Sequence, residues 1–361
     1  MVRGELDAAD EALEPALAGA ERIGDRRLVY EGLTQRASML AERGRLVEAI
    51  VLWEGAIRGL EAAGDEQLAD NAWVDLAVWS IDIDPAAALS AHQAIIERQR
   101  RKGDRRTRAT VVGNAAEIAV GSGEWDWAVA QLTDVLGDDQ SPSDRVVTME
   151  QLTIIAALRG QPEAEARLAE AKALAGDNPT LLDILDDRTA TIEWVAGRHR
   201  EAATIWRHYA GWSNLNATSA LPRAARASLW AGDITGARAD LDALVATGVH
   251  GAVIDAWLAT IGAGIAAAEG RIGDARREHR EALTRWRALG QPWFESLTCL
   301  DLVLLLDVAD LDVDAAAERA REVFTQLGAW PFMDMLDTRL ARAGGKAPAT
   351  RPVSTTELVR G

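Results

Sequence analysis

A six-residue turn recurs along the chain and restricts its architecture more than any other feature. It reads GRLVEA at residues 44–49, GRHREA at 197–202 and GRIGDA at 270–275. In each copy an alanine follows a glycine after five positions. The same spacing, with aspartate for glycine in two cases, marks further units: Gly4/Ala9, Asp82/Ala87, Gly123/Ala128, Gly232/Ala237 and Asp310/Ala315. With Gly160 these turns lie 35–41 residues apart, and such a period predicts a repeat architecture.

The turn has a simple physical interpretation. A helix commonly ends with glycine in the left-handed conformation, where a Cβ would clash. The alanine five residues later then faces the preceding helix from the first turns of the next one. A second small residue, seven positions before the glycine, supplies the matching contact: Ala37, Ala116, Ala190, Ala225 and Ala263. Each unit is therefore predicted to be a helical hairpin, and hairpins of this kind bury their faces by stacking into a solenoid.

The segments between the turns agree with an all-α fold. Residues 86–103 and 275–290 place apolar side chains at three- and four-residue spacing. Gly-Asp pairs at 24–25, 64–65 and 103–104 are expected to close the second helix of a hairpin. We find no alternating, β-branched run that predicts a strand. The sequence thus predicts a solenoid of about eight or nine hairpins over residues 1–343, closed by a short helix near 330–343. The Gly-, Pro- and Thr-rich segment 344–361 is expected to be a disordered, linker-like tail.

The repeat resembles the tetratricopeptide repeat. Ala16, Ala56, Ala94 and Ala282, twelve positions after their turns, extend the resemblance, although the period exceeds 34 residues and the closing proline is mostly absent. Longer units of this type resemble the sensor region of MalT-like, large LuxR-type regulators, and residues 278–306 and 316–344 look like the closing units of that region. The resemblance implies a right-handed superhelix whose first helices line an inner groove.

Composition excludes several classes of function. The net charge is −17, from 56 acids and 39 bases, so most of the surface would repel nucleic acid, and no direct contact with it is expected. The segment 252–268 contains mostly small residues and Asp255, which favours a buried helix over a membrane span. Cys299 is the single cysteine, and the start of the chain lacks an apolar leader segment. Both fit a cytoplasmic protein.

The chain also lacks recognisable catalytic or cofactor motifs. There is no G-x-x-x-x-G-K-[ST] motif and no Ser-His-Asp or Cys-His arrangement, so we expect no enzyme and no cofactor. No two of the five histidines are spaced four apart, and no acid near them in sequence completes a metal triad. They are His92, His199, His208, His250 and His279. No metal site is therefore expected.

One basic run stands out in this acidic chain. The segment 98–108 contains seven bases: Arg98, Arg100, Arg101, Lys102, Arg105, Arg106 and Arg108. It is interpreted as a solvated turn at a repeat boundary, with a docking patch for a partner domain as the functional alternative.

Tryptophan usage suggests where a ligand could bind. The chain has 13 Trp against three Phe and two Tyr. Trp53 and Trp206 fall nine after a turn and are expected in the core. Other residues fall at the positions that line the groove in this repeat class: Trp79, Trp194, Trp230, Trp257, Glu117, Glu150, Asp187 and Arg226. The hypothesis is that these Trp have open faces for a ligand, while the alternative is packing between neighbours. Arg226 would suit an anionic ligand, whereas the three acids would suit a basic one. The charge of the ligand is therefore left open.

These features predict non-catalytic binding. The chain is expected to be the repeat region of a bacterial signalling or transcription regulator, with a small effector or a protein segment in the groove. The alternative is a stand-alone adaptor that scaffolds a protein assembly.

Truncation tests the interpretation of the tail. Because residues 344–361 lack the apolar side chains that would offset ordering entropy, removing everything after residue 343 should leave the melting temperature nearly unchanged. A drop of many degrees in a thermal melt would show that the tail contributes to the folded core.

Overall fold

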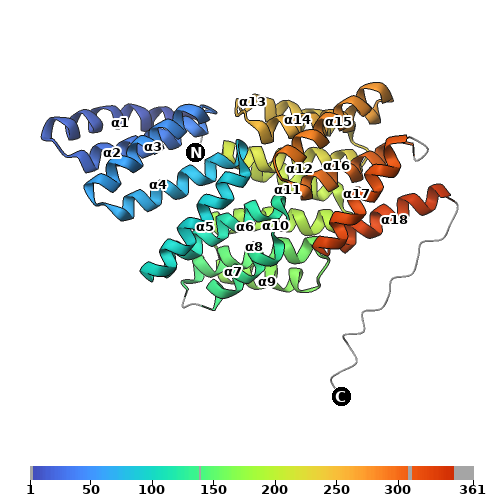
Figure 1. Ribbon diagram of the computed structural model, residues 1–361, viewed down its shortest axis with the longest axis horizontal. Coiled ribbons are helices and arrows are strands. Elements are labelled where there is room, and N and C mark those ends of the chain that lie inside the picture. Colours follow the sequence, from blue (N-terminus) through green and yellow to red (C-terminus); the bar gives the residue numbers. More distant parts are fainter. Residues whose placement is uncertain (1–2, 138–139, 308–310, 345–361) are drawn as a thin grey trace, which may run out of the picture.

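The computed structural model describes residues 3–137, 140–307 and 311–344, and these ranges contain helices and no strand (Figure 1). The α-helices are α1 (Arg3–Ile23), α2 (Arg26–Glu42), α3 (Leu46–Ala63), α4 (Glu66–Trp79), α5 (Pro85–Lys102), α6 (Arg105–Ser122), α7 (Trp125–Leu136), α8 (Pro142–Leu158), α9 (Glu163–Ala175), α10 (Pro179–Val195), α11 (His199–Ala210), α12 (Asn214–Trp230), α13 (Ile234–Ala246), α14 (Ala252–Ala268), α15 (Ile272–Ala288), α16 (Pro292–Leu305), α17 (Leu311–Leu327) and α18 (Trp330–Gly344). A 3₁₀ helix, η1 (Ser80–Asp82), follows α4. The predicted all-α solenoid is confirmed.

The Gly-Asp pairs end one helix and start the next. Gly64 has a φ of +77°, and Asp65 then accepts a hydrogen bond from the backbone N–H of Leu68 at 3.2 Å. Gly103 and Asp104 repeat this arrangement between α5 and α6. A left-handed glycine reverses the chain, and the aspartate satisfies a free N–H of the new helix. Each pair therefore produces a sharp boundary between hairpins.

Consecutive helices form eight hairpins, from α2/α3 to α16/α17, with α1 before them and α18 after them. The small residues predicted at the contact are buried as expected. Ala37 on α2 and Ala49 on α3 are fully buried in one core, as are Ala190 and Ala202 in α10/α11. The closing helix expected near 330–343 is α18. None of the described helices combines the length and apolarity that crossing a bilayer requires.

Some expected turns differ from the pattern. Gly4 lies inside the first turn of α1, because the first unit has no preceding helix among the described residues. At Asp82 the chain forms the 3₁₀ helix η1 in place of a left-handed turn, which a residue with a Cβ rarely adopts. The turn at Asp310 and the tail from residue 345 lie outside the described residues.

The solenoid closes on itself after five hairpins. Asn214, at the start of α12, donates from its side chain to the carbonyl oxygen of Glu42, at the end of α2, at 2.5 Å. Arg159, at the end of α8, donates to the carbonyl oxygen of Leu327, the last residue of α17, at 3.0 Å, and the next residue, Gly160, lies against Pro331 in the first turn of α18. The C-terminal end of one helix therefore meets the N-terminal end of the helix ten positions later in the chain, as α2 meets α12 and α8 meets α18. Figure 1 shows the late helices returning toward α6 and α8.

Glycines permit this close return of the chain. A Cβ on Gly251, just before α14, would lie 2.3 Å from the carbonyl oxygen of Asp82. A Cβ on Gly121, in α6, would lie 2.0 Å from Oε1 of Gln291, just before α16. Among the described residues, the next turn thereby packs against the inner face of the preceding one, where the resemblance implied a long open groove.

Enlarging the alanine contact tests the hairpin frame. Ala49→Leu or Ala202→Leu should destabilise the protein by about 1–3 kcal/mol, because overpacking a close helix contact forces the backbones apart. Ala62→Leu, on the exposed face of α3, is the matched control and should change little. Chemical denaturation measures all three, and parent-like stability of both buried variants would contradict the frame.

Candidate functional site

The Trp residues expected in an open groove are mostly core residues. Trp79, Trp194 and Trp257 are only 6%, 6% and 4% exposed, and Trp230 is partly buried. Their predicted open faces are therefore wrong for three of the four. The cause is the closed superhelix. Phe332 of the last helix lies 4.9 Å from the Trp194 ring, for example.

The turn-on-turn contact leaves a cavity of about 260 Å³ between the helices, partly open to solvent on the side of Glu117. Its wall comes from η1 and from α4, α5, α6, α8, α10, α11, α12, α14 and α16. Six aromatic side chains line it: Trp194, Trp206, Tyr209, Trp257, Trp293 and Phe294. A concave, largely apolar space with a few polar groups is the usual form of a small-molecule site.

Sequence reasoning found part of this wall. Trp194, Trp257, Glu117 and Arg226 line the cavity, whereas the other predicted groove residues do not. Those others are Trp79, Trp230, Glu150 and Asp187. The predicted core positions of Trp53 and Trp206 are confirmed, since both are fully buried. Sequence reasoning missed Asp82, Tyr209, Trp293 and Phe294. Of these four, only Asp82 was marked by the sequence, because it stands at a turn position that glycine occupies in most of the repeats.

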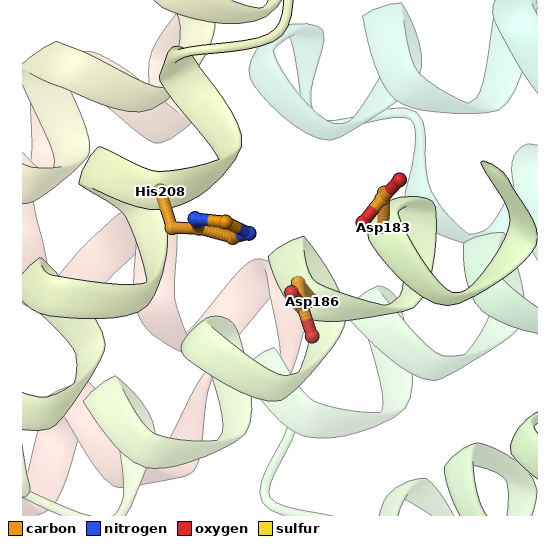
Figure 2. A group of neighbouring side chains, drawn as sticks. All are labelled: Asp183, Asp186 and His208. Atoms are coloured by element: carbon orange, nitrogen blue, oxygen red, sulfur yellow. The ribbon is translucent and has the colours of Figure 1, made fainter. Parts of the chain in front are cut away.

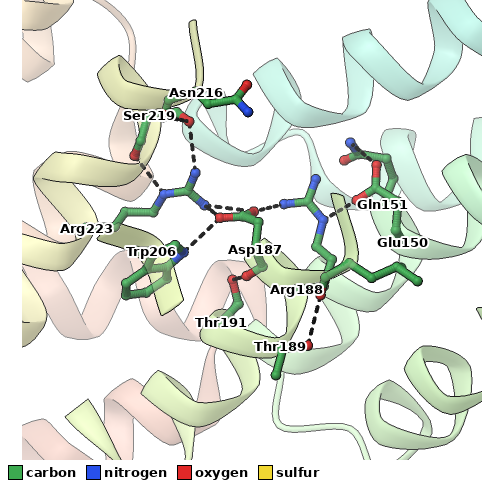
Figure 3. Close-up of polar contacts among 11 residues, drawn as sticks. Glu150, Gln151, Asp187, Arg188, Thr189, Thr191, Trp206, Asn216, Ser219 and Arg223 are labelled. Carbon is green, nitrogen blue, oxygen red and sulfur yellow. Dashed lines mark hydrogen bonds and ion pairs between the residues drawn. The ribbon is translucent and has the colours of Figure 1, made fainter. Parts of the chain in front are cut away.

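Glu150 and Asp187 belong to a buried ionic network (Figure 3). Asp187 pairs with Arg188 and with Arg223, the latter at 2.9 Å, and accepts a hydrogen bond from Nε1 of Trp206 at 2.7 Å. Arg188 also pairs with Glu150. Since both acids are saturated by protein partners, their predicted exposure to a ligand is wrong, and they support the cavity wall from behind.

Burial and charge act in opposite directions in this network. Burial raises the pKa of Glu150 to about 7, because desolvation outweighs the attraction of Arg188. Burial also opposes ionisation of Asp187, yet Arg223 and Arg188 together lower its pKa. The pKa of Arg188 is raised despite burial, because two acids surround it. The guanidinium of Arg188 therefore stays charged and holds α8 to α10.

Arg226 has its charge balanced in the same manner. Its Nε lies 2.9 Å from Oδ2 of Asp301, whose Oδ1 accepts a hydrogen bond from Nε1 of Trp230 at 2.7 Å. The guanidinium lies 5.0 Å from the centroid of the Trp257 ring. Asp301 thus takes up most of the charge that was expected to serve an anionic ligand.

A second hollow lies at the N-terminal end, between α1, α2 and α3. It is larger, about 950 Å³, but open to solvent. The charges along it are paired with one another, as in the contacts of Arg43 with Asp10 at 2.7 Å and with Asp7 at 2.8 Å. Its open shape offers little surface to enclose a ligand, so the central cavity is the stronger candidate.

Two neighbouring helices bring together three metal-ligating side chains, Asp183, Asp186 and His208 (Figure 2). One ligand atom from each lies within 4.8 Å of the others. Sequence spacing did not point to this group, because its members come from two different helices, α10 and α11. Partly exposed acids often cluster in this way without an ion, and no second feature of the described structure points to one.

The basic run 98–108 spans the turn between α5 and α6. Arg98 pairs with Asp70 at 2.7 Å, and Arg108 with Asp134 at 2.6 Å. Lys102 lies 3.0 Å from the carboxylate of Asp70. Bases at the end of α5 also complement its helix dipole. These contacts favour the solvated repeat boundary over the docking patch.

The single thiol is chemically quiet. Cys299 is fully buried in α16, and burial raises its pKa to about 12. A thiol of this kind remains protonated and is a poor nucleophile.

Removing Arg188 should weaken the fold strongly. Arg188→Ala leaves two buried acids without their shared cation, a loss that costs roughly 3–5 kcal/mol. The control is Arg198→Ala, which breaks an exposed pair with Glu193 and should cost under about 1 kcal/mol. Urea unfolding compares the variants, and equal losses would show that the buried network contributes no more than a surface pair.

Comparisons with known proteins show little. No family model matches the chain, and no curated protein is significantly similar to it. Among solved structures 31 chains match. One is described as a circular tandem repeat protein with novel repeat topology and enhanced subunit contact surfaces. It has 13% sequence identity and a TM-score of 0.25, and the match covers 95% of this chain and 91% of that one. A likeness this distant supports no functional inference.

Proposed function

We propose that this chain is a non-catalytic binding module that takes a small effector into its central cavity. The observation that carries the proposal is the cavity itself, which lies between helices from two successive turns and is lined by six aromatic side chains. A protein segment would need a long open groove, and the closed superhelix covers the face that would provide one. The small effector is therefore favoured over the protein segment.

The polar groups of the wall support binding over catalysis. The hydroxyl of Thr218 donates to the carbonyl oxygen of Leu215 at 3.0 Å, and that of Ser219 donates to the carbonyl oxygen of Asn216 at 3.1 Å. Arg223 in turn donates to the Ser219 hydroxyl at 3.1 Å. The Ser219 hydroxyl contacts a carbonyl oxygen and an arginine, and no base that would activate it as a nucleophile is found for it among the described residues, whereas Thr218 also hydrogen-bonds to the carboxylate of Asp82. These groups are suited to shaping and orienting a ligand.

The position of the cavity suggests how binding could be transmitted. A ligand there would contact both turns of the superhelix at once and would stabilise their closed arrangement by its binding free energy. A bacterial signalling or transcription regulator with a helical-repeat sensor region would use such a coupling. Membership of that class is part of the proposal, as is the alternative of a stand-alone adaptor.

Filling the cavity tests the proposal. Asn114 lines the cavity from α6, so Asn114→Trp should occupy the space. Thr110→Trp, on the exposed part of the same helix, is the matched control. A library of fragments of about 10–15 non-hydrogen atoms is screened by thermal shift, since a ligand at a hundredfold its Kd stabilises by about 2.7 kcal/mol.

We expect some fragments to stabilise the parent and Thr110→Trp but not Asn114→Trp. The proposal fails if no fragment binds the parent, or if the same fragments bind Asn114→Trp equally well.

A further inference from the structure

One acid in the cavity wall, Asp82, has a hydrogen bond from Thr218 but no cationic partner among the described residues. Asp82, at the end of η1, is 5% exposed and lines the cavity. Its Oδ2 has no hydrogen-bond donor among the described residues, and no arginine or lysine of the described structure pairs with it. An isolated buried carboxylate is costly unless a cation or several donors compensate it. The fold therefore maintains an uncompensated negative group at this wall.

The other charges around the cavity do not offset this one. Arg223 and Arg226 line the cavity, but Arg226 is paired with Asp301, and Arg223 is paired with Asp187, which it shares with Arg188. Glu117 lines the more exposed side, and no ion pair is found for it among the described residues. With both arginines neutralised, the unbalanced charge of the wall is negative.

The aromatic side chains complete the environment. Trp194, Trp206, Trp257 and Trp293 line the same space; Arg223 already lies over the Trp206 ring and Arg226 over the Trp257 ring, so Trp194 and Trp293 are the indoles left for a ligand. Aromatic faces attract ammonium groups through the ring quadrupole, and clusters of them are the usual receptors for alkylated ammonium ligands. The acid and the indoles around this cavity both favour a positively charged ligand.

We infer that the effector is an organic cation, an amine or quaternary ammonium on a compact apolar body, with its charge directed toward Asp82. This inference rests on the proposed function and specifies its ligand. The sequence left the charge of the ligand open. A positive charge is favoured because Asp82 and Glu117 line the cavity, while the carboxylates of Glu150 and Asp187 are already paired with arginines.

Titration of Asp82 gives independent support. Burial raises its pKa from 3.8 to about 6, and hydrogen bonding from Thr218 opposes the shift only in part. No charged neighbour contributes to this shift, and the other charged groups of the wall are Glu117, Arg223 and Arg226. A raised carboxyl pKa means that the folded state binds the proton more tightly, so stability falls as pH rises from about 4 to about 6. Above that range the full penalty is present, and a bound cation would relieve it.

The test compares three probes by isothermal titration: benzyltrimethylammonium, 2-phenylethanol and 3-phenylpropionate. We expect the cation to bind at least about tenfold more tightly than the neutral and anionic probes, as charge pairing and cation–π contact predict. Asp82→Asn should weaken cation binding by at least about tenfold while raising or preserving the melting temperature of the ligand-free protein at pH 8. Asp75→Asn is the matched control, because burial raises the pKa of Asp75 to about 6 as well, yet it does not line the cavity.

A second measurement needs no variant. Because the quaternary probe keeps its charge, its affinity for the parent should rise between pH 5 and pH 7.5 as Asp82 ionises. The inference is overturned if the alcohol or the carboxylate binds as tightly as the cation, if the cation does not bind, or if Asp82→Asn keeps the parent affinity. If the neutral probe binds the parent as tightly as the cation and Asn114→Trp abolishes this binding, the preference for a cation is wrong but the proposed function stands. If the probes bind Asn114→Trp as tightly as the parent, they do not bind in the cavity, and both the preference for a cation and the proposed function are wrong.

Discussion

The rest of the structure depends on the meeting of helices that lie ten apart in the chain. The hydrogen bond from the Asn214 side chain to the carbonyl oxygen of Glu42 joins residues 172 positions apart, and that from Arg159 to the carbonyl oxygen of Leu327 joins residues 168 apart. The nearly constant separation reflects the repeat: five hairpins bring the chain around once. Without this contact the inner face would be an open groove, whereas with it that face becomes a core enclosing one small cavity.

Closure also determines which charges can serve a ligand. When two turns pack together, acids and bases of the inner helices lose water and must find partners within the protein. Asp187 and Asp301 do so with two arginines of α12, Arg223 and Arg226, each at a distance of 2.9 Å. Asp82 has only a hydrogen bond from Thr218 and no cation among the described residues, and retaining such a group lowers the stability of the ligand-free protein. Such a loss of stability is typical of functional sites, because a charged group that binds a ligand can destabilise the folded protein when the ligand is absent.

The hairpins could be predicted from the sequence, because they depend on local rules. A left-handed glycine, an aspartate cap and an alanine in close contact each act within a few residues, as Gly64, Asp65 and Ala49 illustrate. The cavity could be predicted only in part. The repeat places Trp194 and Trp257 on the inner face, and both do line the cavity. Their burial could not be predicted, because it depends on contacts some 170 residues away that the local pattern does not encode.

A disulfide between the two turns tests this closure most directly. Glu42→Cys and Asn214→Cys place thiols where the end of α2 meets the start of α12, and the buried Cys299 should not compete. If the superhelix is closed, mild oxidation should form this bond within the native chain, and peptide mass spectrometry should identify it. Arg58→Cys combined with Asn214→Cys, with its first thiol on the exposed face of α3, should not form one. Failure of the Glu42/Asn214 pair to exceed this control would contradict the closed superhelix and the cavity that depends on it.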